Sequence, residues 1–412
     1  MPRNLLHKLP FFKKDETDKL SKLILKDGQY REDCSAAIAF IKKNPNADFN
    51  FHKQYTYYGI PLSLVDIAYI NDIKLLSAIL EHPSMQHNAI HDTDFLFDRV
   101  ENSPEIRAFY KKHFIIPQNQ KLQVLKPLSI NSQLTGKNNF SEAFKDFPQD
   151  NKWRLFIDSK KQIEENGWLD FECREPGYLQ GMYAAWDLVE NSIEDDLSIG
   201  LIKSLHLQCT GGVRGMVNSL TPGCFRQGCS RNGLSEGENV SIAGLIELIE
   251  SEHYNRHYHI ENAFIKFPTR ELALFENDIT HLMNEYYGTI HSAPHPEKKL
   301  FCIIRLISSL ERLHPFSDGN TRLFSMILLN RELIKQGFSP TIMQNPNRSV
   351  GFSQRELYDE IIQGMETFQQ IKAGHFLGKG NQAIQELLMS DEKYDICKES
   401  PENSNLSASF RP

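Results

Sequence analysis

Residues 314–322 read HPFSDGNTR, and this stretch decides the fold because it joins two apolar segments. The segment before it, Glu297–Leu313, has apolar residues on more than one helical face, and Thr321–Gln336 repeats that pattern after it. Such patterns predict buried helices. Pro315 cannot continue a helix interior, so the first helix must end beside it. The stretch, termed the motif loop, therefore connects two buried helices.

The motif loop has the backbone of an anion site. Gly319 allows a tight turn. The backbone N–H groups of Asn320, Thr321 and Arg322 then lie at a helix N-terminus, where unpaired donors and the positive end of the helix dipole favour a phosphate. The Arg322 guanidinium adds donors that match phosphate oxygens in pairs.

Two further side chains of the motif loop suit catalysis. Asp318 offers hard oxygen ligands, which Mg²⁺ accepts when it also bridges to substrate phosphates. In this loop, His314 is the side chain whose ordinary pKa, about 6.5, lets it take a proton near neutral pH. We therefore expect a metal ligand at Asp318 and a base at His314.

The motif loop resembles the signature of the Fic family, His-Pro-Phe-x-(Asp/Glu)-Gly-Asn-(Gly/Lys)-Arg, and departs from it at Thr321. Tyr178–Gly212 looks like the two helices before the family's flap, and Pro222–Arg226 (PGCFR) looks like the start of that flap. Ala263–Leu274 looks like its return. The resemblance implies a mostly α fold, with a Fic-type helical core and a small β-hairpin flap. We expect this two-stranded flap over residues 223–267, with Arg226 structural.

The Fic resemblance also implies an enzyme that transfers part of a nucleotide to a Ser, Thr or Tyr hydroxyl of a target protein. His314 would be the general base, so the rate should fall below about pH 6.5. Asp318 would hold Mg²⁺ or Mn²⁺, and Phe316 would anchor the loop in the core. ATP is the family's commonest donor, which makes adenylyl transfer (AMPylation) the first expectation. The residues that would bind the donor are Phe316, Gly319, Asn320, Thr321 and Arg322.

One departure from the family leaves the donor open. Many members carry a second Arg three residues after the signature Arg, and this chain has Ser325 there. A nucleoside triphosphate would lose a charge-assisted contact of about 1.5–3 kcal/mol. Another triphosphate, or a conjugate such as CDP-choline from which related enzymes with ankyrin repeats transfer phosphocholine, is the alternative. Thr321 leaves a second alternative, an inactive Fic scaffold that binds a partner.

The family's inhibitory helix is not expected. Its usual pattern is (Ser/Thr)-x-x-x-Glu-(Gly/Asn), whereas Ser159–Asn166 reads SKKQIEEN, with the Ser one residue too early for Glu164. We expect a charged surface helix at this place.

Residues 1–150 are predicted to form a helical domain before the Fic domain. Ala37–Asn46 (AIAFIKKNPN) aligns with Leu76–Met85 (LSAILEHPSM), as the units of repeat proteins do. Tyr57–Pro83 resembles an ankyrin repeat, so a degenerate ankyrin-like recognition domain and an ordinary helical domain are both open. The catalytic domain would span residues 155–375, and residues 376–412 would form a short helix and a polar acidic tail.

Charge and composition exclude several classes. A net charge of −7 and a pI near 6.1 argue against general nucleic-acid binding, which requires clustered Lys and Arg. No apolar run reaches the length of about 18 residues that a membrane span needs, and the N-terminus does not resemble a signal peptide. The seven cysteines are scattered, without CxxC pairs, and we expect reduced thiols in a cytoplasmic protein. Residues 390–412 resemble a type IV secretion signal, which leaves delivery into a host cell as an effector open.

Overall fold

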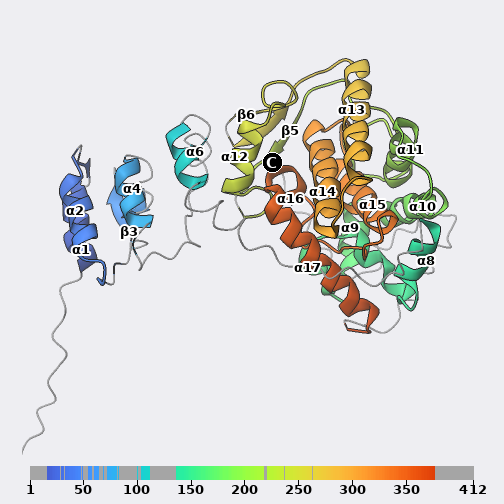
Figure 1. Ribbon diagram of the computed structural model, residues 1–412, viewed down its shortest axis with the longest axis horizontal. Helices are drawn as coiled ribbons and strands as arrows, with labels where there is room; N and C mark the ends of the chain where they lie inside the picture. The colour runs from blue at the N-terminus through green and yellow to red at the C-terminus, as the bar shows by residue number, and fades with distance from the viewer. Residues whose placement is uncertain are drawn as a thin grey trace, which may run out of the picture. The chain divides into compact units, whose positions relative to one another are not determined.

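The computed structural model describes residues 16–111 with gaps, and residues 136–375 apart from 218, 219, 236 and 262. The chain divides into two compact units, Met1–Tyr110 and Lys111–Pro412. Helices are the main elements of the described residues (Figure 1). The mostly α fold with small sheets, which the Fic resemblance implies, is therefore confirmed.

The first unit is built from short elements. Helices α2 (Ser35–Lys43) and α4 (Ile73–Leu80) overlap the two aligned segments and pack against each other. Helix α2 buries Ala37 and Ile41, and α4 buries Leu75 and Ile79. The ankyrin-like character of residues 1–150 stays a prediction. The remaining elements are α1 (Glu16–Ile24), β1 (Leu25–Lys26), β2 (Gln29–Tyr30), β3 (Gln54–Tyr57), β4 (Ile60–Ser63) and α6 (Pro104–Tyr110).

Helix α14 (Pro296–Leu313) is the central helix of the second unit, as its apolar pattern predicts. It packs against α13 (Leu272–Ile290), α15 (Leu329–Lys335), α16 (Arg348–Gly351) and α17 (Gln354–Lys372). Figure 1 shows it between α13 and α17. Helices α10 (Tyr178–Asn191) and α11 (Ile199–Thr210) pack against each other and complete this core.

The helix expected over residues 321–336 is divided. Its first part, η4 (Arg322–Leu328), is a π-helix, and α15 continues the chain until Gly337, which has a φ of +82°. π-helical turns are rare and occur often at functional sites. This wider turn follows directly after the motif loop.

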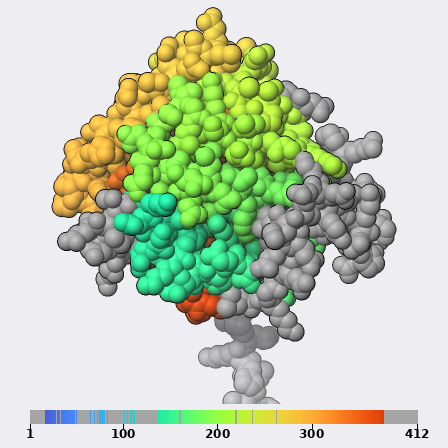
Figure 2. Space-filling model, turned by 90° about the vertical axis from the view of Figure 1, so that its right-hand side faces the viewer, coloured from blue at the N-terminus to red at the C-terminus, as the bar shows by residue number. Residues whose placement is uncertain are grey.

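The aromatic residues of α8 (Lys137–Phe144) join the core of the second unit. Phe140 stacks on Phe144, with 5.1 Å between ring centroids, and both rings contact Trp186 of α10. Figure 2 shows the teal residues of this part of the chain beside the green residues that follow them. The division into compact units therefore falls at Tyr110, before the domain boundary expected near residue 150. The elements after α8 are η2 (Gln149–Phe156), η3 (Ser159–Ile163) and α9 (Gly167–Arg174), and η3 is a short 3₁₀ helix where a surface helix was expected.

The flap, residues 223–267, differs from the two strands expected. Strand β7 (Phe264–Phe267) lies between β5 (Ser230–Gly233) and β6 (His259–Glu261) in a three-stranded antiparallel sheet. Helix α12 (Ile242–Glu250) lies between β5 and β6 in the chain. The expectation is wrong because the apolar run at residues 242–248 is helical: Ser241 caps it by accepting a hydrogen bond from Gly244 N (2.9 Å).

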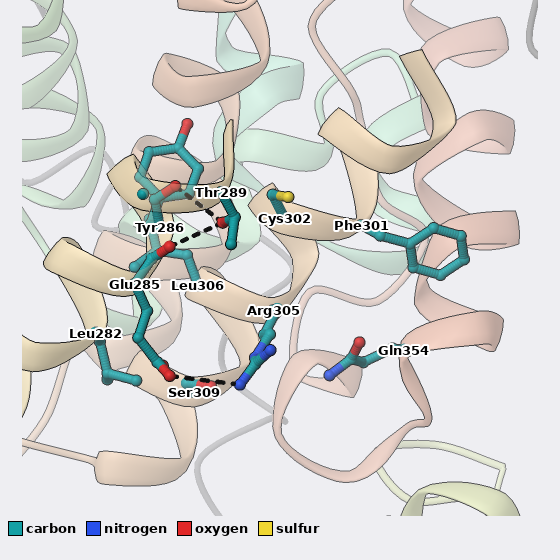
Figure 3. Close-up of a pocket in the computed structure, with 11 residues that line it drawn as sticks. Leu282, Glu285, Tyr286, Thr289, Phe301, Cys302, Arg305, Leu306, Ser309 and Gln354 are labelled. Carbon is teal, nitrogen blue, oxygen red and sulfur yellow. Dashed lines mark hydrogen bonds and ion pairs between the residues drawn. The ribbon is translucent and has the colours of Figure 1, made fainter. Parts of the chain in front are cut away.

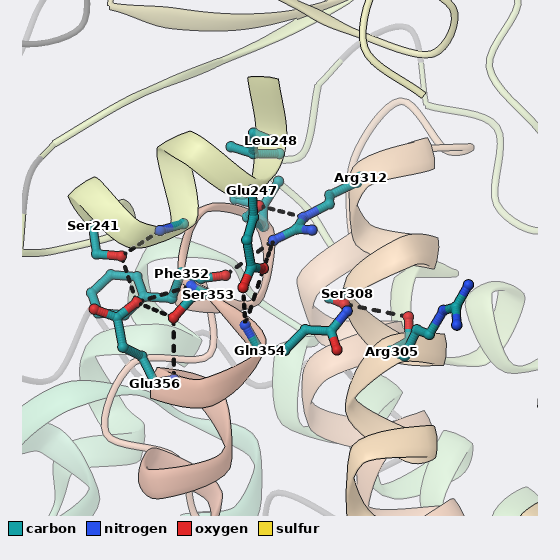
Figure 4. A network of polar contacts seen from close by, with 12 residues as sticks. Ser241, Glu247, Leu248, Arg305, Ser308, Arg312, Phe352, Ser353, Gln354 and Glu356 are labelled. Atoms are coloured by element: carbon teal, nitrogen blue, oxygen red, sulfur yellow. Dashed lines mark hydrogen bonds and ion pairs between the residues drawn. The ribbon is translucent and has the colours of Figure 1, made fainter. Parts of the chain in front are cut away.

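Polar contacts fix α12 on the helical core (Figure 4). The Glu247 carboxylate accepts a hydrogen bond from Gln354 N at the start of α17 (3.1 Å) and pairs with Arg312 of α14 (3.7 Å). Burial raises the pKa of Glu247. Ser241 donates to Glu356 (2.6 Å), whose carboxylate also caps its own helix. The flap is therefore attached to both α14 and α17.

The described residues bear on two expectations about the compartment. None of their helices combines the length and hydrophobicity that crossing a bilayer requires. The expectation that every cysteine is reduced is wrong at Cys173, which is disulfide-bonded. Residues 376–412, predicted to be a helix and tail, lie outside the described residues. Free thiols are present at Cys34, Cys209, Cys224, Cys229 and Cys302.

Candidate active site

The motif loop begins where α14 ends in a left-handed residue. His314 has φ +47° and ψ +59°, and its N–H bonds to the carbonyls of the preceding turn. A non-glycine residue in this region is strained. Buried Arg226 stabilises it by donating from Nε to His314 O (2.7 Å) and from its backbone N–H to Pro315 O (2.8 Å). The flap therefore holds the backbone of the loop.

The motif loop lines a cavity of about 530 Å³, termed the motif cavity. It brings together the predicted residues His314, Asp318, Gly319, Asn320, Thr321 and Arg322. Phe316 lies outside it, completely buried, with its ring 5.3 Å from that of Phe225. The rest of the lining comes from α9, α10, α14, η4, the flap and nearby loops.

The His314 ring is positioned by Phe267 and Asn320. It stacks on Phe267 of β7, with centroids 4.3 Å apart. The Asn320 amide exchanges two hydrogen bonds with the backbone of Phe316 (3.1 and 2.9 Å), which fixes the orientation of the amide. Its Nδ2 lies 3.3 Å from His314 Nε2. Since an amide nitrogen only donates, Nε2 carries the lone pair and can accept a proton.

The His314 ring is neutral across the physiological range. Burial, and then the positive charge of Arg226, lower its pKa to about 3. The fall in rate expected below pH 6.5 stays a prediction, and burial argues against it in the free protein, because a buried imidazole loses the solvation of its charged form. Among the described residues, Nδ1 has no hydrogen-bond partner.

Asp318 faces the motif cavity with both carboxylate oxygens near backbone N–H groups. Oδ1 accepts from Gly319 N (2.7 Å), and Oδ2 lies 3.4 Å from Val217 N. Gly319 has φ +76°, and a Cβ there would lie 2.6 Å from Thr210 Cγ2. Both the positive φ and the short contact with Thr210 therefore require glycine at residue 319. Leu323 N bonds to Gly319 O (3.0 Å), so the helix starts directly at the loop.

Arg322 does not stand free in the cavity. Its guanidinium pairs with Glu175, which follows α9, and lies over the Tyr178 ring at 4.6 Å. Both side chains of the ion pair are largely buried, at 12% and 15% exposure. Burial, and then the charge of Arg174, lower the pKa of Arg322 to about 10, so it stays charged. A bound phosphate must share or displace Glu175.

Glu311 is a lining residue that the sequence analysis missed. It lies on the last turn of α14, and Ser325 Oγ donates to its Oε1 at 2.5 Å. Burial raises the pKa of Glu311 to about 8. Ser325 occupies the position of the family's second Arg, so the cavity presents a carboxyl group in that region. The motif cavity also contains Asp158 and the ring of Phe171.

A second cavity of about 480 Å³ lies between α13 and α14, beside the start of α17 (Figure 3). Glu285 and Arg305 form an ion pair across it (3.7 Å). It shares no lining residue with the motif cavity. This second cavity is therefore separate from the motif loop.

Comparisons with known proteins give a distant relative. No family model matches the sequence. The chain is 24% identical over 278 residues to phosphocholine transferase AnkX of Legionella pneumophila subsp. pneumophila. The match covers 55% of this chain and 29% of that protein, so the chain spans less than a third of its relative. The chain is therefore similar to part of a protein named as a transferase, and its helical core agrees with the fold that the Fic resemblance implies.

Proposed function

We propose that this chain transfers phosphocholine from CDP-choline, or a donor of the same kind, to a hydroxyl group of a target protein. The observation that carries the proposal is Glu311, a buried carboxyl group that lines the motif cavity and accepts a hydrogen bond from Ser325. In its charged form, Glu311 would repel the negative charge of a triphosphate and attract the fixed positive charge of choline. The similarity to a protein named phosphocholine transferase supports the same donor over ATP.

The lining of the motif cavity suits a quaternary ammonium group. Such cations bind to the faces of aromatic rings and to carboxylates. Asp158 and Glu311 supply carboxyl groups. The rings of Tyr178 and Phe171 each already carry a cation, Arg322 over Tyr178 (4.6 Å) and Arg174 over Phe171 (4.8 Å), which shows that this part of the lining accepts positive groups. Choline would shift Glu311 towards its charged form, because a neighbouring cation favours a carboxylate.

The base of the proposed reaction is His314. Its Nε2 would take the proton of the target hydroxyl as that oxygen bonds to the phosphorus that carries choline. The bridging P–O bond then breaks, and CMP leaves with its electron pair. The target becomes a phosphodiester. Arg322 and the N–H groups at the start of the helix would hold the phosphate oxygens during this exchange.

Asp318 would hold Mg²⁺ or Mn²⁺ with the donor. The described residues contain no group of three or more metal-ligating side chains, and a single carboxylate fits an ion that takes its other ligands from phosphate and water. When bound, the ion would neutralise charge on the transferred phosphate.

A direct test offers the full chain a cell lysate with either choline-labelled CDP-choline or α-phosphate-labelled ATP. We expect protein labelling from CDP-choline, and its loss in His314→Ala. Glu311→Gln should lower labelling from CDP-choline, while Glu285→Gln in the second cavity serves as the matched control. Labelling from ATP alone would restore adenylyl transfer. Labelling no greater than that of the lysate alone, from the wild type as from His314→Ala, would favour the binding-scaffold alternative.

The acceptor on the target protein would be a Ser, Thr or Tyr hydroxyl. The bacterial source of the relative agrees with the second expectation for localisation, an effector delivered into a host cell. Detection of labelled protein in host lysate, and not in bacterial lysate, would support that placement. The opposite pattern would contradict it.

A further inference from the structure

His206 of α11 contacts the motif loop but does not line the motif cavity. Its side chain is completely buried. The ring lies parallel to that of Phe316, with centroids 3.7 Å apart and an angle of 8° between planes. Nε2 lies 3.0 Å from Asp318 O, and Nδ1 lies 2.9 Å from Gly223 N. One side chain therefore connects α11, the motif loop and the start of the flap.

The hydrogen bonds determine the tautomer of His206. Gly223 N–H can only donate, so Nδ1 is the acceptor. The neutral ring then carries its hydrogen on Nε2 and donates it to the Asp318 carbonyl. Gly223 has φ +75°, and a Cβ there would lie 3.2 Å from Lys203 O. Glycine adopts this φ without strain and avoids that tight contact with α11.

The donated hydrogen bond selects one of two orientations of the Asp318–Gly319 peptide. The carbonyl of a trans peptide points opposite to its N–H. With Asp318 O directed at His206, the Gly319 N–H is directed away from α11, where Asp318 Oδ1 now accepts it. Glycine tolerates either orientation of the preceding peptide, so the loop backbone alone does not exclude the flipped form.

We propose that His206 is a positioning residue that keeps the Asp318–Gly319 peptide with its N–H towards the donor phosphate. This inference rests on the proposed function, because the peptide matters only if the motif cavity binds a phosphate. In the flipped form a carbonyl oxygen would face the phosphate and repel it. Asp318, the expected metal ligand, would change direction with its own carbonyl.

Two substitutions separate the hydrogen bond from the stacking. His206→Phe keeps an aromatic ring against Phe316 and removes both hydrogen bonds. His206→Gln loses the ring and keeps an amide that can donate to Asp318 O. We expect the Phe variant to bind CDP-choline with Mn²⁺ about 10–100 times more weakly, the usual effect of removing a group that orients a metal ligand. The Gln variant should stay within a few-fold of the wild type.

Donor affinity is measured by calorimetry without target protein, and melting temperature is measured beside it. A purely structural role predicts that affinity follows melting temperature, with Gln the worse variant. Our proposal predicts the reverse order for affinity. His281→Phe, at a side chain that is 68% exposed, is the control. If the wild type binds and the Phe variant matches it, the proposal is wrong. If the wild type binds no donor, the proposed function itself fails.

Discussion

Replacement of Glu311 by Gln should change how the stability of this protein depends on pH. In the folded chain, burial raises the pKa of Glu311 from 4.5 to about 8. Between these values the folded state holds a proton that the unfolded state has lost, so raising the pH lowers the free energy of unfolding. The slope is about 1.4 kcal/mol per pH unit, or roughly 5 kcal/mol over the interval.

Gln has nearly the same shape, still accepts from Ser325 and does not titrate. At pH 5 the variant and the wild type should melt at similar temperatures. At pH 9 the variant should melt on the order of 10 °C higher, since 1 kcal/mol shifts the melting temperature of a large domain by about 2 °C or more. Other buried carboxyl groups, such as Glu247, are common to both proteins and cancel in the difference.

Thermal unfolding followed by circular dichroism from pH 5 to pH 9 measures this difference. Glu285→Gln, at a side chain that is 42% exposed, should stay close to the wild type throughout. A wild-type curve that runs parallel to the Glu311→Gln curve would refute the reasoning. CDP-choline binding at pH 7 should also release a proton, because choline favours the charged carboxylate. Calorimetry in two buffers of different ionisation enthalpy detects it.

His314→Ala should lower transfer by about a hundredfold or more. At saturating donor the wild-type rate should stay level from pH 8 to pH 5, because the His314 pKa of about 3 keeps the imidazole neutral; a fall centred near pH 6.5 in that pH–rate profile would contradict this. Asp318→Ala should abolish transfer without lowering the melting temperature, and transfer that survives EDTA would exclude its metal role. Gly319→Ala should destabilise the loop by about 1–2 kcal/mol from its left-handed backbone alone. Gly319→Ala should also weaken donor binding, measured by calorimetry. In that variant, the additional change Thr210→Ser removes the methyl group 2.6 Å from the new Cβ and should restore part of the binding.

The central helix and the motif loop could be predicted because their signals are local. Glu297–Leu313 carries its apolar pattern within one helix, and Pro315 marks its end. The three-stranded flap could not be predicted in the same way. The run at residues 242–248 is apolar without a decisive period, and its helix is fixed by a cap and by contacts with α17.

The partners of the site residues depend on tertiary structure. Glu175 is 147 residues from Arg322 in the chain, and no local pattern pairs them. His206 lies 112 residues from Asp318 and occurs in an ordinary amphipathic helix. Glu311 is different, because it lies one helical turn before His314 and its position on α14 could have indicated that it faces the loop. The raised pKa of Glu311, however, follows from burial, which depends on the tertiary structure.

The ion pair between Arg322 and Glu175 makes donor binding an exchange of anions. The Arg322 guanidinium exchanges the Glu175 carboxylate for a phosphate of the donor. Because the guanidinium is already largely removed from water in the free protein, donor binding requires less further desolvation of it. Added salt screens the old pair as well as the new one, and the affinity for the donor should therefore depend on ionic strength less than the charges of a phosphate and an arginine suggest. The Glu175 carboxylate already lies 3.3 Å from Arg174, and it would pair with Arg174 after it leaves Arg322.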